Sequence, residues 1–471
     1  MQAKKIESSY QLSPMQQGML FHTLLARHSG VYIQQLCCGL HEVLNVAAFV
    51  AAWERATERH AVLRTSFRWD GVEGPLQLVH KRVEIPFERH DWRGLGPEEQ
   101  ERRLDEHVEQ DRRRGFEPEQ APLMRLALFR MAEADYRLVW TSHHALLDGR
   151  SRLLLLEEVF ELYRALREGG EPRLASPRPY GDFIEWLRGR DQTAAGKFWR
   201  EELKGFNAPT PVGASGTAAA REAAAGRHAV QGLRLSADDT SALRSFARRH
   251  ELTLNSLLQG AWALLLSRHA GTQDVVFGTT RACRRTAFEG ADGMIGLLIN
   301  TVPVRISVEP DAPLLPWLKG LRAQGVALRE YEHTPLYKIQ EWSEVPAGLP
   351  LFESILVFEN YQLNVLLRSA GGAWLDRDFR LLEQSDYPLA LLGYDGDELL
   401  LRLAYSRDRF EDEAAARMLS QLHTLLFGMA RGEERRLCEL TLLTEAERRR
   451  VLYEWNDTET PFAREACVHE L

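Results

Sequence analysis

The stretch Tyr136–Gly149, YRLVWTSHHALLDG, determines the fold class that we expect for this chain. Its first half, Tyr136–Ser142, is mostly apolar or β-branched and predicts a buried strand. A helix from about Ser151 to Arg167 follows, because apolar residues recur there along one helical stripe. A polar loop between a rigid strand and a rigid helix holds its side chains in fixed, exposed positions, which suits catalytic groups. The segment therefore predicts an α/β fold with functional residues in this loop.

The segments before this loop alternate between helical and strand patterns. Ser13-Pro14-Met15-Gln16 has the residue order of a capping box, with serine as N-cap and proline at the first helical position. Asp70-Gly71 has the composition of a tight turn and predicts a hairpin. We expect helices over Val46–Arg59 and Glu98–Arg114, and strands over Val62–Trp69 and Leu76–His80.

The residues after the loop show the same mixed pattern beyond a proline-rich break, Pro172–Pro179. We place the lobe boundary there, with an N-terminal lobe at 1–175, a C-terminal lobe at 176–438 and a tail at 439–471. The segment 208–226, rich in Ala, Gly and Ser, predicts an exposed or poorly ordered loop. We expect strands over Ala229–Leu235, Val275–Thr279, Ile299–Ile306, Phe352–Phe358 and Leu399–Tyr405, and helices over Tyr180–Arg190, Leu254–His269, Asp412–Met429 and Thr444–Trp455.

Composition and charge exclude several classes of protein. The 471 residues accommodate about two to four domains, or two lobes that share one large interface. The net charge of −8 argues against a nucleic-acid partner, which requires a basic surface. Five cysteines without a CxxC pair predict neither a disulfide framework nor a zinc site, and favour a reducing cytoplasm. The N-terminus lacks the apolar core of a signal peptide, and no apolar run reaches the length of a membrane span.

The loop itself carries the strongest chemical signal. Neighbouring residues on a strand point to opposite faces, so one of His143 and His144 can face a cavity while the other packs inward. Asp148 is placed to accept a hydrogen bond or to hold a cation, and Gly149 permits a positive φ or the close approach of a ligand. A pair of buried, hydrogen-bonded histidines near a turn is the alternative. A metal site is a weaker interpretation, because no third ligand follows at a suitable spacing, and GxSxG, P-loop and GxGxxG motifs are absent.

The pattern HHxxxDG after a strand resembles the active-site motif of condensation domains of nonribosomal peptide synthetases. These domains belong to an acyltransferase superfamily that includes chloramphenicol acetyltransferase. Over about residues 8–430, further segments resemble the family's motifs in the same order: LSPMQQGMLFH (Leu12–His22), ERHAVLRTSF (Glu58–Phe67), YGDFIEWLR (Tyr180–Arg188), IGLLINTVPVR (Ile295–Arg305) and LFESILVFENY (Leu351–Tyr361).

The resemblance implies two chloramphenicol-acetyltransferase-like lobes in a V shape, with the active site in a tunnel between them. His144 is then the catalytic residue, which takes the proton of an attacking α-amine or positions that amine against a thioester. His143 and Asp148 are expected to be structural. Arg64 is expected to be the ion-pair partner of Asp148, or alternatively a surface strand residue. Gly149 is expected to direct a backbone N–H toward the developing oxyanion.

The subtype expected from the resemblance is a starter, lipo-initiating condensation domain. The tail resembles a linker into an adenylation domain, Asp148-Gly149-Arg150-Ser151 departs from the DGWS of many elongating members, and Met1 lies 12 residues before Ser13. Such a domain transfers a fatty acyl group from acyl-CoA to the α-amine of a phosphopantetheine-bound aminoacyl acceptor. Its partners are a carrier protein, a downstream adenylation domain and acyl-CoA, with no covalently bound cofactor and no metal.

Three alternatives stay open. The first is an elongating domain that joins a carrier-bound aminoacyl or peptidyl donor to an aminoacyl-carrier acceptor. The second is an inactive module that only docks carrier proteins. The third is a free-standing acyltransferase that acts on a small soluble amine.

Overall fold

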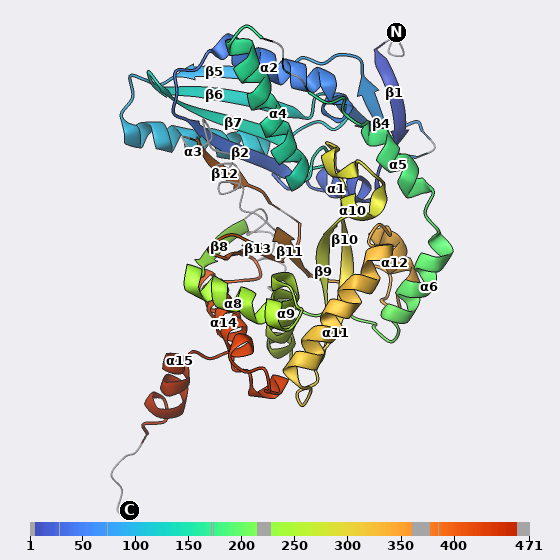
Figure 1. The fold of residues 1–471 in the computed structure, drawn as a ribbon, viewed down its shortest axis with the longest axis vertical. Helices are drawn as coiled ribbons and strands as arrows, with labels where there is room; N and C mark the ends of the chain where they lie inside the picture. The colour runs from blue at the N-terminus through green and yellow to red at the C-terminus, as the bar shows by residue number, and fades with distance from the viewer. Residues whose placement is uncertain are drawn as a thin grey trace, which may run out of the picture.

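Two stacked lobes, each built on a β-sheet, form the body of the protein (Figure 1). The computed structural model describes residues 5–27, 29–72, 74–170, 172, 174–213, 228–359, 377–384 and 386–458. Three sheets of five, six and three strands organise these residues, and helices cover the two larger sheets. The expected α/β architecture of two lobes is confirmed.

The upper lobe contains the five-stranded sheet, in the order β12-β2-β7-β6-β5. Only β5 and β6 run parallel, and the other neighbouring pairs are antiparallel. Although β12 belongs to the second half of the chain, it pairs with β2 at the edge of this sheet, so the two halves interlock. The strands are β2 (Ile33–Leu40), β5 (Phe87–Asp91), β6 (Met124–Ala132), β7 (Asp135–His143) and β12 (Arg377–Leu382).

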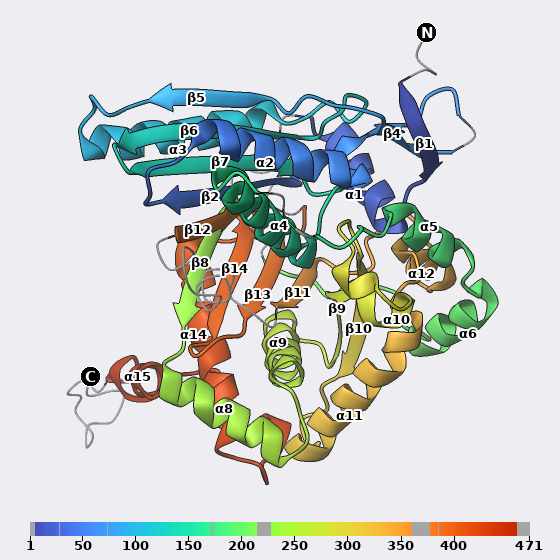
Figure 2. The ribbon, with the colours of Figure 1, turned by 45° about the horizontal axis from the view of Figure 1, so that its top comes forward.

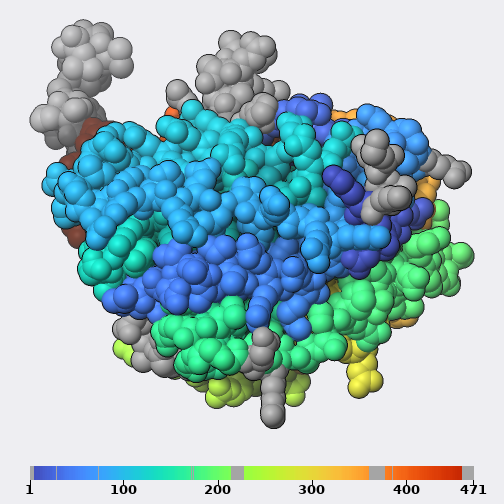
Figure 3. Space-filling view, turned by 90° about the horizontal axis from the view of Figure 1, so that it is seen from above, coloured from blue at the N-terminus to red at the C-terminus, as the bar shows by residue number. Residues whose placement is uncertain are grey.

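Helices cover both faces of this sheet. Helices α2 (Val46–Arg59) and α4 (Gly149–Arg167) contact each other and pack on one face, where Trp53 meets Trp140 edge to face at a ring distance of 5.0 Å. Helix α3 (Pro97–Arg114) covers the other face. Seen from above, the surface consists mainly of residues from the first half of the chain (Figure 3).

A three-stranded antiparallel sheet, β1-β4-β3, flanks the upper lobe. Its strands are β1 (Ile6–Gln11), β3 (Thr65–Arg68) and β4 (Leu76–His80). The strand expected over Val62–Trp69 is too long, because Ala61–Arg64 forms a turn of 3₁₀-helix (η2) in which the Leu63 N–H donates to the His60 carbonyl at 3.0 Å.

The lower lobe contains the six-stranded sheet, in the order β10-β9-β11-β13-β14-β8. The strands are β8 (His228–Arg234), β9 (Asp274–Ala282), β10 (Ile299–Ser307), β11 (Ser354–Glu359), β13 (Leu389–Tyr394) and β14 (Leu400–Ser406). The helices in its hydrophobic core are α8 (Ala237–Arg249), α9 (Leu254–Ala270), α11 (Leu314–Ala327) and α14 (Asp412–Ala430). Helix α9 is buried over most of its circumference, which explains its nearly continuous apolar sequence.

Shorter elements connect the lobes and end the described chain. Helix α1 (Pro14–Leu25) begins with the expected capping box: the Gln16 N–H donates to Ser13 Oγ at 3.2 Å, and the Ser13 N–H to Gln16 Oε1 at 2.9 Å. The remaining helices are α5 (Tyr180–Arg188), α6 (Gln192–Glu202), α10 (Arg284–Ala287), α12 (Leu336–Trp342) and α15 (Glu445–Arg449). Helix α15 projects from the lower lobe in Figure 1, and in the view of Figure 2 it overlaps the end of α8. None of the helices in the described ranges has both the length and the apolar character needed to cross a membrane.

The segment 208–226 lies mostly outside the described residues, which resume at 228. Its first part, 208–213, differs from the expected exposed loop, because Thr210 and Val212 are buried. The Thr210 hydroxyl accepts the Val276 N–H at 2.8 Å, so this part of the connection is bound to β9.

Candidate active site

The two adjacent histidines lie where β7 ends and the chain turns toward α4. Backbone hydrogen bonds fix both residues: the His143 N–H donates to the Leu123 carbonyl at 3.0 Å, and the His144 N–H to the Tyr32 carbonyl at 2.8 Å. The two side chains have different environments, as expected from strand alternation. His143 is fully buried, whereas His144 is half-buried and borders a cavity.

His143 is bonded at both ring nitrogens. Its Nδ1 accepts the Ala145 N–H at 3.1 Å, so the proton of the neutral ring lies on Nε2. That Nε2 lies 3.0 Å from Thr23 Oγ1, to which it donates, and the Thr23 hydroxyl donates in turn to the Met19 carbonyl at 2.8 Å. Burial, with His144 beside it, lowers the pKa of His143 to about 3, so the ring is neutral. Neither nitrogen is free to exchange a proton with a substrate.

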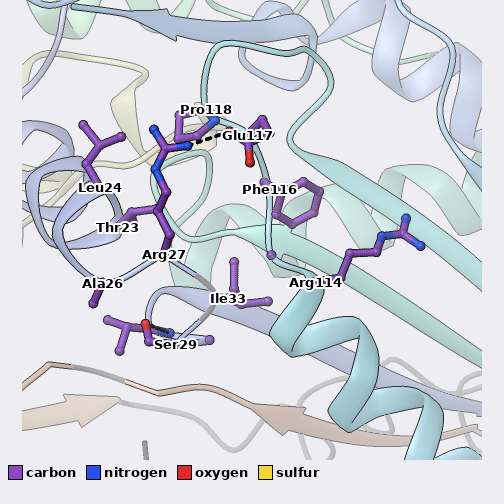
Figure 4. Close-up of a pocket in the computed structure, with 13 residues that line it drawn as sticks. Thr23, Leu24, Ala26, Arg27, Ser29, Ile33, Arg114, Phe116, Glu117 and Pro118 are labelled. Atoms are coloured by element: carbon purple, nitrogen blue, oxygen red, sulfur yellow. Dashed lines mark hydrogen bonds and ion pairs between the residues drawn. The ribbon is translucent and has the colours of Figure 1, made fainter. Parts of the chain in front are cut away.

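Thr23 also lines a small pocket of about 20 Å³ between the end of α1 and the loop after α3 (Figure 4). Ile33 and Phe116 line the same pocket, and an Arg27–Glu117 ion pair of 3.2 Å lies at its border. His144 does not line this pocket, which is too small for a substrate.

His144 has the opposite proton arrangement. Its Nδ1 lies 2.9 Å from the Leu147 carbonyl oxygen, and a carbonyl oxygen only accepts hydrogen bonds. The proton of the neutral ring is therefore on Nδ1, and none of the described residues donates a hydrogen bond to the lone pair of Nε2. Burial lowers the pKa of His144; the Glu383 carboxylate opposes this shift, and Arg152 adds to it. The ring is therefore a neutral proton acceptor at the cavity wall.

The cavity that His144 borders lies between the two lobes and has a volume of about 790 Å³. That volume is in the range of small-molecule binding sites. Charged side chains from both lobes line it, among them Arg152, Glu359 and Glu383. Aliphatic side chains of the six-stranded sheet line it as well: Val230, Ile355, Val357, Ala390, Leu392 and Ala404.

Asp148 joins the lobes through a buried ion pair with Arg284. The Arg284 Nη2 donates to the two Asp148 carboxylate oxygens at 2.7 and 2.9 Å. The Arg284 side chain is 5% exposed and the Asp148 side chain 1%. The carboxylate also accepts the N–H groups of Ser151 at 2.8 Å and Leu298 at 2.9 Å. Asp148 is thus the N-cap of α4 and an anchor for the chain of the other lobe.

The expected pairing of Asp148 with Arg64 is wrong. Arg64 is buried at the end of the 3₁₀ turn, where its guanidinium binds the Glu7 carboxylate at 2.7 Å and the His80 carbonyl. The turn directs the side chain toward the three-stranded sheet rather than toward the loop. Arg64 does not line the interlobe cavity.

Gly149 is the first residue of α4 and lines the cavity. Gly149 was expected to adopt a positive φ or to allow the close approach of a ligand. Its φ is not positive, so the close approach of a ligand is the remaining expectation. The first N–H groups of a helix have no intrahelical partner, and the helix dipole is positive at this end. The start of α4 therefore presents a favourable potential for negative charge beside His144.

Sequence reasoning missed Arg284 and the contacts around Gly296. The Gly296 carbonyl accepts the Asp148 N–H at 3.1 Å, and the Tyr180 hydroxyl donates to the Leu297 carbonyl at 2.9 Å. A Cβ on Gly296 would lie only 2.2 Å from the Tyr180 ring, so this position requires glycine. Tyr180 and Gly296 lie in two of the segments that resemble family motifs, so the sequence did mark these positions. Arg284 lies in none of those segments, and nothing in the sequence indicated its role.

Among the described residues, neither His143 nor His144 is part of a cluster of potential metal ligands. Within the described residues, one group of side chains has ligand atoms close enough together to hold an ion, and it consists of Glu88, His90 and His107. These three residues lie on β5 and α3 and do not line the interlobe cavity.

Comparisons with known proteins show the family to which the chain belongs. The condensation-domain family model matches residues 6–452. Linear gramicidin synthase subunits C and B of Brevibacillus parabrevis are 42% identical over 469 residues and 43% identical over 466 residues. These matches cover 100% and 99% of this chain, which spans only 6% and 9% of the two relatives.

Solved structures share the fold. The starter condensation domain of rhizomide synthetase aligns with a TM-score of 0.77 at 19% identity, over 93% of this chain and 100% of that one. The X-domain in complex with OxyB from teicoplanin biosynthesis aligns with a TM-score of 0.77 at 23% identity, over 93% and 97%. The chain belongs to the condensation-domain family, the amide-forming acyltransferases of nonribosomal peptide synthetases.

Proposed function

We propose that this domain joins an acyl thioester donor to the α-amine of an aminoacyl group on a carrier protein, with His144 as the catalytic residue. The observation that carries the proposal is the free Nε2 lone pair of His144 at the wall of the interlobe cavity. His143 and Asp148 hold the loop, and Arg64 has no part in the reaction.

The chemistry needs one proton acceptor and one site for negative charge. The amine nitrogen attacks the thioester carbonyl carbon, the new C–N bond forms, and the surplus proton on nitrogen passes to His144 Nε2. We propose that the N–H group of Gly149, at the positive end of α4, binds the charge that develops on the carbonyl oxygen. The C–S bond then breaks, and the proton passes from His144 to the departing thiolate. Holding both reactants in one cavity supplies a further part of the acceleration.

For the donor we propose a carrier-bound aminoacyl or peptidyl group, as in an elongating domain. The identity of 42% and 43% to linear gramicidin synthase subunits C and B supports this choice, whereas the starter condensation domain of rhizomide synthetase is only 19% identical. The aliphatic wall on the six-stranded sheet favours the second candidate, the starter reaction with an acyl-CoA donor.

One experiment separates these donors. The purified domain is mixed with an aminoacyl-loaded carrier and either aminoacyl-carrier donors or acyl-CoA donors of increasing chain length, and products are identified by mass spectrometry. We expect amide only from carrier-bound donors. N-acylated product from acyl-CoA alone would replace this choice with the starter reaction, and its yield against chain length would report how much of the aliphatic wall is used. No amide from any pair would refute the proposed function.

Two exposed apolar surfaces support the proposed partners. Phe21 and Leu25, 62% and 74% exposed, lie one turn apart on α1, whose Met15 and Met19 line the cavity, so a carrier docked there delivers its arm to the site. In the tail, Leu452, Tyr453 and Trp455 are exposed. We propose that 439–471 leads into an adenylation domain that covers these residues. Of the two lobes before it, at 1–175 and 176–438, the second contributes β12 to the sheet of the first.

A charge placed on α1 tests the carrier surface. Phe21→Glu is expected to lower kcat/KM for a carrier-bound acceptor about tenfold or more, while leaving turnover of a short aminoacyl thioester that needs no docking unchanged. An equal loss with both acceptors would show that α1 acts through the cavity rather than through docking.

A further inference from the structure

A carboxylate that the mechanism above does not use borders the same cavity as His144. Glu359 is the last residue of β11, where it pairs in register with Tyr394 of β13, and its carbonyl accepts the Asp395 N–H at 2.9 Å. Its side chain is half-buried and lines the cavity. Within the described part of the chain, no hydrogen bond or ion pair engages its carboxylate. A carboxylate in this position is available to a ligand.

The groups that face Glu359 come from five other elements. Glu383, just after β12, is held by Gln34 of β2, whose Nε2 donates to Glu383 Oε2 at 2.9 Å. Arg152 of α4 donates to the Oε1 of the same Gln34, so one amide links the cation and the carboxylate. Asp148 also acts on Glu359, but its charge is paired with Arg284. On the adjoining strands, Tyr394 and Arg402 line the cavity, with the Arg402 guanidinium 5.7 Å from the centre of the Tyr394 ring.

This arrangement favours a bound cation with a removable proton. Arg152 and Arg402 line the same cavity, but within the described residues neither arginine forms an ion pair with Glu359, so its carboxylate can pair with an ammonium group. Burial, together with Glu383 and against the effect of Arg152, raises the pKa of Glu359 to about 7. An α-ammonium group has a pKa of about 8, so proton transfer from it to Glu359 is nearly balanced.

We propose that Glu359, with Glu383 beside it, forms an ammonium-binding subsite and deprotonates the acceptor's α-ammonium before the amine attacks the donor. The inference rests on the proposed function, because it assumes an amine acceptor. One N–H bond of the ammonium breaks, an O–H bond forms on the Glu359 carboxylate, and the nitrogen keeps the electron pair. Glu359 later returns this proton to water in the open cavity. The second proton, released after attack, goes to His144.

The test is the pH dependence of amide formation by the Glu359→Gln variant. At pH 7 only about one tenth of an amine with a pKa near 8 is neutral, so we expect the variant to be about tenfold slower than the native chain at that pH. The two should converge by about pH 9, where the amine loses its proton to water without help. With a hydroxylamine-type acceptor, which is already neutral at pH 7, the variant should be as fast as the native chain.

Two further variants make the result specific. Glu330→Gln changes an exposed carboxyl far from the cavity lining and should leave the profile unchanged. Glu383→Gln removes the like charge that raises the pKa of Glu359, so the acid limb should move to lower pH. A loss in Glu359→Gln that is equal at all pH values, or equal with the neutral acceptor, would overturn the proposal.

A binding measurement stands apart from turnover. The probe is a stable amide analogue of aminoacyl-pantetheine, compared with its N-acetyl form by calorimetry at pH 7. The native chain should bind the free ammonium form about tenfold more tightly, and Glu359→Gln should lose this preference. Equal affinities in the native chain would overturn the subsite even if amide forms. A preserved preference in a chain that makes no amide would overturn only the proposed function.

Discussion

Removing the Asp148 carboxylate should destabilise the protein, because it breaks a buried ion pair between the two lobes. In Asp148→Ala the Arg284 guanidinium keeps its charge at 5% exposure but loses its only carboxylate partner among the described residues. Breaking a buried ion pair from one side costs about 3–5 kcal/mol, and the loss of a helix N-cap about 1 kcal/mol. The N–H groups of Ser151 and Leu298 also lose their acceptor. We therefore expect the free energy of unfolding to fall by at least about 3 kcal/mol.

A double-mutant cycle isolates the ion pair from the other effects. Arg284→Ala should also destabilise, because it leaves Asp148 buried and without its cation. The double variant should cost less than the sum of the two single variants, by about 2 kcal/mol or more. Asp148→Asn keeps an oxygen for the Ser151 N–H and should fall between the native chain and Asp148→Ala. The measurement is urea unfolding followed by tryptophan fluorescence.

A surface ion pair of the same type is the control. Asp182 and Arg178 lie 2.9 Å apart and are 41% and 44% exposed, so Asp182→Ala should cost less than about 1 kcal/mol. If Asp148→Ala were as mild as Asp182→Ala, or if the cycle gave no coupling between Asp148 and Arg284, the reasoning about the interlobe contact would be refuted.

The other site residues give three shorter predictions. His144→Ala should abolish amide formation and change the free energy of unfolding by less than about 1 kcal/mol, because the ring borders a cavity; native-like yield in a mass-spectrometric assay would contradict its role. His143→Ala leaves the buried Ala145 N–H without its acceptor and removes the donor to the Thr23 hydroxyl, and it should cost about 1–3 kcal/mol in urea unfolding, whereas an unchanged midpoint would argue against this account. Arg64→Ala breaks a pair with Glu7 outside the cavity and should leave kcat unchanged; a lower kcat at equal folded fraction would restore it to the active site.

Local chemistry could be predicted from the sequence, because its causes lie within a few residues. The capping box at Ser13 depends on Gln16, three positions away, and the opposite environments of His143 and His144 follow from strand alternation. The loop between a strand and a helix was also predictable, since the change from one period to the other is visible in the sequence.

Long-range pairing could not be predicted in the same way. Arg284 lies 136 residues from Asp148, and among 59 lysines and arginines nothing in its own neighbourhood marks it as the partner. Arg64 was chosen because it lies in a recognised motif, but a 3₁₀ turn directs it to Glu7. The edge strand β12 is short and crosses to the other lobe, so its pairing depends on the fold as a whole.

Two residues of one type perform different tasks in this loop, because their neighbours decide which nitrogen carries the proton. A backbone N–H on Nδ1 of His143 places its proton on Nε2, where Thr23 binds it. The Leu147 carbonyl on Nδ1 of His144 leaves Nε2 free for a substrate. Leu147 precedes Asp148, whose carboxylate is fixed by the other lobe through Arg284. The Asp148–Arg284 contact between the lobes therefore sets the position of the Leu147 carbonyl, which selects the Nδ1–H tautomer of His144. The ability of His144 to accept a proton depends on that contact, although Asp148 takes no part in the proton transfer.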